Sequence, residues 1–133
     1  MIHPELQLRD DIIATLKADI GPLKAVYEDD PDPQEERNFP YCQINWNGSG
    51  PIEDHPIGGR QYRDVEFTAR IVAQEALSDP ATPVMEARLH IEQVLWENFK
   101  CIFLDATPGH DAEGRRLSFQ QEIGFMINIE YDI

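Results

Sequence analysis

The longest uninterrupted alternation of apolar and polar side chains falls within residues 60–74. Side chains along a strand point in turn to the two faces of a sheet, so a period of two predicts a strand with one face on a core and one in water. The segment has no Gly or Pro, and its β-branched and aromatic residues favour a strand. Its apolar positions share one parity and are Val65, Phe67, Ala69 and Ile71.

The closing segment, residues 117–133, repeats this alternation, with a departure at Gln121. We predict that two long strands, 60–74 and 117–131, pair at the centre of a sheet and turn their apolar faces toward helices. The apolar parity of the closing segment comprises Leu117, Phe119, Ile123, Phe125, Ile127, Ile129, Tyr131 and Ile133.

Shorter strands are predicted at residues 25–27 and 41–47. In the second, Cys42, Ile44 and Trp46 share a parity opposite to Gln43 and Asn45. We expect this strand to pair antiparallel with 60–74 across a long loop at 48–59, which is too rich in Gly and Pro for a regular element. Residues 101–104 are predicted as a short strand or turn, 105–116 as a second long loop, and 28–38 as an acidic, Pro-containing loop.

Two helices are predicted from apolar residues at helical spacing. The first covers residues 4–19, and Gly21-Pro22 would end it. The second begins at Ser78-Asp79-Pro80 or at Thr82-Pro83 and runs to about Phe99. The apolar stripe of the first comprises Leu6, Ile12, Ile13, Leu16 and Ile20, and that of the second comprises Val84, Ala87, Ile91, Val94 and Leu95.

The order helix, strand, strand, strand, helix, strand predicts an α+β fold. We expect a mostly antiparallel or mixed sheet of four or five strands with both helices packed on one face. The chain has 133 residues, and that length suits one domain over residues 1–133.

Composition narrows the function classes. The formal net charge is -14, and so acidic a surface repels nucleic-acid phosphates and anionic lipids. No apolar run is long enough to span a membrane, and the first residues lack the pattern of a signal peptide. Cys42 and Cys101 lie far apart, which favours two buried thiols over a disulfide or zinc site. We expect an intracellular protein with no membrane contact.

No catalytic motif is present. Glu86 and His90 lie one helical turn apart but lack the second histidine of a zinc-protease motif, which favours an i,i+4 surface pair. The group His110, Asp111 and Glu113 is better interpreted as a solvated loop than as a metal site. We therefore expect no metal, no cofactor and no enzymatic activity. A small hydrolase using clustered carboxylates stays open as an alternative, as does an acidic binding or inhibitor domain.

The polar parities of the two long strands are unusually acidic and include the base Arg70. A solvated face is the interpretation that composition favours. The alternative is that several copies arrange their sheets around an axis, so that this face lines an acidic channel. The acids concerned are Asp64, Glu66, Glu122, Glu130 and Asp132.

A further set of features recurs along the chain in this order: the Glu5-Leu6 helix, Phe39-Pro40 before a strand, the long hairpin loop, Tyr62, Glu66-Phe67 and Ile71-Val72, Met85-Glu86 with Arg88, and the closing Ile127 to Tyr131 strand. In these features, their order and its length, the chain resembles the phage tail terminator family, which contains the minor tail protein U of lambda-like phages. The acidic loop at 28–38 departs from the family pattern.

This resemblance implies a structural virion protein at the head-proximal end of a tail, assembled in the host cytoplasm. Family members form a hexameric ring that caps the tail tube, ends its polymerisation and offers a docking surface to the head connector. A neck or head-completion protein is the alternative in the same class. The implied partners are further copies of the chain, the tube protein and the connector, while DNA passes through without specific binding.

The resemblance also assigns roles to residues. Those expected to face the channel are Asp64, Glu66, Arg70, Glu122 and Glu130. Those expected in contacts between subunits or rings are Ile52, Glu53, Asp54, His55, Ile57, His110, Asp111, Arg115 and Arg116. We expect that replacing Glu66 and Glu122 with lysine leaves folding intact yet impairs DNA passage.

Overall fold

The computed structural model describes residues 3–28, 40–51, 60–74, 79, 81–108 and 118–132. The two helices and five strands agree with the predicted α+β class. Their bounds are α1 Pro4–Ala18, β1 Ala25–Tyr27, β2 Tyr41–Pro51, β3 Arg60–Gln74, α2 Ala81–Phe99, β4 Ile102–Pro108 and β5 Ser118–Asp132.

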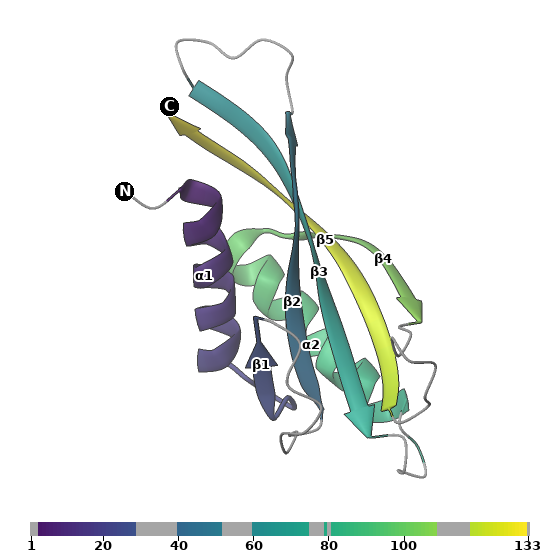
Figure 1. Cartoon of the computed structure of the whole chain (residues 1–133). Coiled ribbons are helices and arrows are strands. Elements are labelled where there is room, and N and C mark those ends of the chain that lie inside the picture. Colours follow the sequence, from purple (N-terminus) through teal and green to yellow (C-terminus); the bar gives the residue numbers. More distant parts are fainter. Residues whose placement is uncertain are drawn as a thin grey trace.

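The strands form one mixed sheet in the order β1-β2-β3-β5-β4. The predicted central pair is confirmed, because β3 and β5 are antiparallel neighbours from Arg60 opposite Asp132 to Gln74 opposite Ser118. The predicted pairing of β2 with β3 is also antiparallel, whereas the short β1 is parallel to β2. In Figure 1 one end of β2, β3 and β5 projects beyond the helices.

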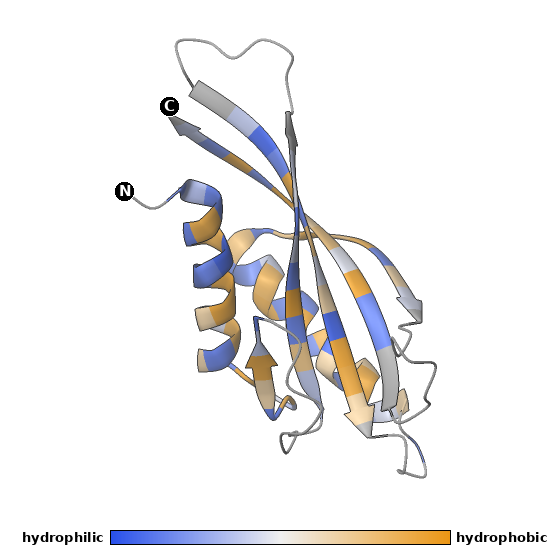
Figure 2. Ribbon diagram, in the orientation of Figure 1, coloured by the Kyte–Doolittle hydropathy of each residue, from blue (hydrophilic) through white to orange (hydrophobic). Residues whose placement is uncertain are grey.

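Both helices lie on the face formed by the apolar parity. Helix α2 packs on β3 and β5, and α1 packs beside it against β1. The predicted α2 stripe is buried as a whole, and so are Ile12, Ile13 and Leu16 of α1. Figure 2 shows the alternating hydrophobic and hydrophilic bands along the long strands. Leu6, predicted in the α1 stripe, is 44% exposed, so this prediction was wrong for the first turn, which lies at the end of the core.

An aromatic row crosses the helix-facing side of the sheet. Trp46 of β2 stacks on Phe67 of β3, which stacks on Phe125 of β5, both with ring centroids 5.5 Å apart. Phe103 of β4 meets Phe125 edge-on at 6.5 Å. The row exists because register pairs Trp46 with Phe67, Phe67 with Phe125, and Phe125 with Phe103, and such cross-strand contacts stabilise a sheet.

Two predicted loops are shorter than expected. Strand β2 continues through Gly48 to Pro51, and β4 continues from Asp105 to Pro108. In both cases a longer neighbouring strand supplies backbone partners, β3 for β2 and β5 for β4. These tertiary hydrogen bonds override the local preference of Gly, Asp and Pro for turns. Each added segment follows a register irregularity, at Trp46/Gly48 and at Phe103/Asp105.

The two thiols are free, and both are buried as predicted. Burial in apolar surroundings penalises the thiolate and raises the pKa of Cys42 and of Cys101 to about 12. At neutral pH both therefore behave as small apolar side chains of the core.

Candidate functional site

The five residues expected to line a channel lie on one face of the sheet, which we call the outer face because it is opposite the helices. Arg70 of β3 pairs with Glu122 of β5, and Tyr62 pairs with Glu130. Directly paired residues share a face, and Asp64 and Glu66 have the same parity as Arg70. The strand parity read from the sequence thus brings together side chains that are far apart in the chain.

The pairing of Arg70 with Glu122 also affects the expectation that replacing Glu122 with lysine leaves folding intact. A lysine at position 122 would stand directly opposite Arg70, and like charges in that position destabilise a sheet. Glu66 and Glu130 are exposed, so they are the better positions for a change of charge.

One end of the outer face is buried, which the sequence did not predict. Tyr41 and Val72 are paired across β2 and β3, and they are 1% and 0% exposed. Gln43 beside them is 4% exposed, and no described group donates a hydrogen bond to its Oε1 atom. Tyr27 of β1 meets the Tyr41 ring edge-on at 5.3 Å. The water-facing part of the outer face therefore begins beyond this apolar end.

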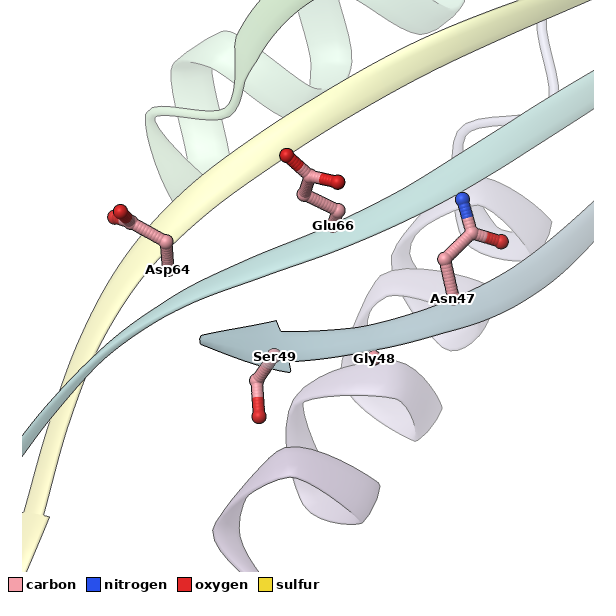
Figure 3. A pocket seen from close by; sticks show the side chains of 5 residues that line it. All are labelled: Asn47, Gly48, Ser49, Asp64 and Glu66. Atoms are coloured by element: carbon pink, nitrogen blue, oxygen red, sulfur yellow. The ribbon is translucent and has the colours of Figure 1, made fainter. Parts of the chain in front are cut away.

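The opposite end of the outer face holds a shallow cavity of about 450 Å³, lined by Asn47, Gly48, Ser49, Asp64 and Glu66. Figure 3 shows Asn47, Asp64 and Glu66 projecting on one side of the two strands and Ser49 on the other. Gly48 lies at the register irregularity of β2 and has a φ of 132°. L side chains rarely adopt that conformation, so the glycine allows the local bend that shapes the cavity.

The prediction from the sequence missed a further acid on this face, Asp105. Asp105 of β4 lies over Gly124 of β5, where an added Cβ would come 2.5 Å from Asp105 Oδ1. The signal was the glycine itself, because a lone Gly inside an alternating strand often marks a close approach. Among described side chains the outer face thus carries five carboxylates, on Asp64, Glu66, Asp105, Glu122 and Glu130, and the guanidinium of Arg70.

The spread of the acids along this face favours repulsion of anions. Within the described ranges no group of three or more His, Cys, Asp or Glu side chains is placed to hold a metal ion. The acids of β3 and β5 instead spread along the strands at register positions two or four residues apart. A long acidic strip of this kind repels a polyanion such as DNA along its whole length.

Several predicted site residues lie outside the described part of the chain. All nine residues of the predicted contact loops belong to this group, namely Ile52, Glu53, Asp54, His55, Ile57, His110, Asp111, Arg115 and Arg116. Asp132 is described as part of β5, but its side chain is not.

His90 has a different partner from the one predicted. Its Nε2 atom lies 2.6 Å from the backbone oxygen of Asp19 and 3.5 Å from the Asp19 carboxylate, rather than pairing with Glu86. The i,i+4 ion pair on α2 is formed by Arg88 and Glu92, at 3.6 Å. His90 therefore joins the two helices, which a pattern within α2 alone could not indicate.

Among the described residues, the exposed large apolar side chains are concentrated on two elements that follow one another in the chain. Leu6 on α1 is the exception, and the others lie on α2 or β4. Large apolar surfaces on a soluble protein often mark contact sites. The residues of α2 are Met85, Leu89 and Trp96, and those of β4 are Ile102, Phe103 and Leu104.

No model of a known protein family matches the chain, and no curated protein matches it either. Neither described helix is long and apolar enough to cross a membrane.

Proposed function

We propose that this chain is a structural protein of a phage tail, a terminator that caps the tail tube as a ring of identical copies. The observation that carries the proposal is the acidic outer face of the sheet. Its five described carboxylates and one guanidinium lie on the face that the helices leave uncovered. The resemblance in the order of motifs along the chain supports the same conclusion.

The physical argument concerns DNA passing through a ring. If the copies turn their outer faces inward, Glu66, Glu130 and their neighbours line the channel. DNA carries one negative charge per ~1.7 Å of helix axis, and protein binding to it depends on lysine and arginine contacts with phosphates. A wall of carboxylates offers no such contacts, so DNA slides through without adhering.

The helices would then lie on the outside of the ring. The projecting ends of β2, β3 and β5, which extend beyond the helices in Figure 1, would give the ring its height and reach the neighbouring component along the tail. In this arrangement the ring, taken as a hexamer, has two flat sides, one for the tail tube and one for the head connector. The protein belongs to the head-proximal end of the tail and is assembled in the host cytoplasm.

A neck or head-completion protein is the second candidate, and the same acidic face supports it. Such a protein also surrounds the DNA path, and it differs in acting on the head side of the joint. The two candidates predict different defects when the protein is missing.

Imaging tails made without this protein tests the proposal. A terminator ends tube polymerisation, so its loss gives overlong tubes, which supplying the intact gene in trans should restore to normal length. A neck component acts later, so its loss gives tubes of normal length that carry no heads. Normal virions with heads attached would refute both functions.

A further inference from the structure

Among the described strands, the sheet has an open edge on each side. Strand β4 is the last strand on one side. On the other side β1 pairs only with Tyr41–Gln43 of β2, so from Ile44 onward no described strand covers the side of β2 that faces away from β3. Open edges present unpaired backbone groups and are common sites of contact with another chain.

The first residues of β4 form an apolar edge beside Arg88 of α2, whose guanidinium also forms an ion pair with Glu92 at 3.6 Å. Ile102, Phe103 and Leu104 are 42%, 39% and 45% exposed. The guanidinium of Arg88 lies over the Phe103 ring, 4.8 Å from its centroid. In a chain with 25 acidic and 11 basic residues, an apolar edge next to arginine is an unusual surface, and it favours an acidic partner.

The β2 edge has the complementary features. A cavity of about 320 Å³ lies there, lined by Arg9, Glu28, Ile44, Asn45 and Trp46. Ile44 and the half-buried Trp46 give it an apolar floor, and Glu28 is exposed at its rim. Arg9 forms an ion pair with Asp10 at 3.1 Å, so Glu28 is the acid that remains to meet an incoming cation.

The aromatic row connects these two surfaces. Trp46 is its end at the cavity, and Phe103 is its end at the β4 edge. The cavity and the apolar edge therefore lie at the same level of the sheet on opposite sides. A second copy can dock on one side and leave the other free for a third copy.

We propose that the β4 edge of one copy packs into the Trp46 cavity of the next, with Arg88 opposite Glu28. The two surfaces differ, so the interface is heterologous, and repeating it head to tail closes a ring when the rotation between copies permits. The proposal deepens the proposed function, on which its ring depends, by naming the contact between neighbours. An apolar centre beside a charge pair is the composition expected of such an interface.

Exchanging the two charges tests the contact. Arg88→Glu alone and Glu28→Arg alone each place like charges across every junction, and we expect at least about tenfold weaker self-association. Mixing the two variants restores association, because a junction between unlike copies again joins opposite charges. Analytical ultracentrifugation over a range of concentrations measures the mass relative to the 15.3 kDa chain.

A matched pair of variants tests the apolar part. Leu104→Asp introduces a charge at the β4 edge, whereas Leu6→Asp makes the same change on α1, at a residue that is 44% exposed and lies outside the apolar group of α2 and β4. We expect Leu104→Asp to abolish association and Leu6→Asp to leave it unchanged. Circular dichroism checks that each variant is folded.

Three outcomes would overturn the contact: a native chain that stays monomeric at every concentration, an oligomer that survives both charge reversals, or two variants that fail to associate when mixed. The imaging of tail length does not depend on these residues. An oligomer that survives the reversals together with overlong tails would therefore reject this interface and keep the terminator function.

Discussion

The ring of His90 in α2 closes on the turn that follows α1, with Nε2 donating a hydrogen bond to the carbonyl oxygen of Asp19 over 2.6 Å. Asp19 is the C-cap of α1, so this bond satisfies one of the carbonyls that a helix end leaves unpaired. The ring fits because residue 21 is glycine, where an added Cβ would come 2.5 Å from the ring atoms. The φ of Gly21 is 55°, which also favours glycine.

We expect Gly21→Ala to lower the free energy of unfolding in two ways. The left-handed conformation costs alanine about 1–2 kcal/mol, and displacing the His90 ring adds about 1 kcal/mol or more. In a His90→Ala background only the first cost remains. Urea unfolding of the two single variants and the double variant measures this coupling, and strictly additive effects would contradict it.

Alternation predicted the core of the long strands well, because burial there follows parity alone. Val65, Phe67, Ala69 and Ile71 are each 0% exposed. The helix-spaced stripe of α2 was equally informative, since a helix on a sheet buries one face. Both patterns are local, so one sequence is enough to show them.

Features that depend on a distant partner could not be predicted in this way. The last residues of β4 look like a loop, and they become a strand because β5 offers free backbone groups beside them. The bond from His90 to Asp19 joins residues 71 positions apart. No spacing rule within one element indicates such a contact.

The candidate site likewise has features that local alternation predicted and features that it missed. Parity placed Asp64, Glu66 and Arg70 on one face, and register confirms that they share it with Glu122 and Glu130. The buried end of that face, with Tyr41 and Val72, was missed because alternating polar neighbours suggested water along the whole strand. Its role as a channel wall stays a prediction, because a channel requires several copies arranged around an axis.

The thiols give a direct probe of the folded core. With a pKa of about 12, the thiolate fraction of either cysteine at pH 8 is about one in 10⁴. We expect almost no alkylation of Cys42 or Cys101 by iodoacetamide in the native protein and complete alkylation of both in urea. Mass spectrometry counts the adducts, and fast labelling of native Cys42 would contradict its burial within the sheet.

The hydrogen bonds of Asp79 at the start of α2 should make the stability of the fold depend on pH. Asp79 accepts hydrogen bonds from the hydroxyl and the backbone N–H of Thr82, and these bonds hold the pKa of Asp79 below its ordinary value. A carboxyl whose pKa is lower in the folded state stabilises the fold above its unfolded pKa of about 4, and this contribution is lost as the pH falls through the folded value.

We therefore expect Asp79→Ala to unfold at a lower temperature than the native chain at pH 7. The gap between the two unfolding temperatures should narrow as the pH approaches about 3. Thermal unfolding followed by circular dichroism measures it. Thr82→Ala removes the hydroxyl and keeps the N–H, so it should show a smaller gap with the same dependence on pH. A gap that does not change with pH would show that the Asp79 charge is not its cause.

The acidic outer face gives the last prediction. Glu66→Lys with Glu130→Lys turns two exposed carboxylates of that face into cations. The matched control is Glu86→Lys with Glu97→Lys, which changes the net charge equally at exposed positions of α2, on the helix side of the sheet. If the outer face lines a DNA channel, the first pair adds phosphate contacts and slows DNA passage, so phage titre falls by at least about tenfold, while the control pair leaves it unchanged.

Both proteins should fold, because none of the four side chains is buried. Equal titres for the two variants would remove the outer face from the DNA path, and equal losses would point to net charge rather than to the position of the acids.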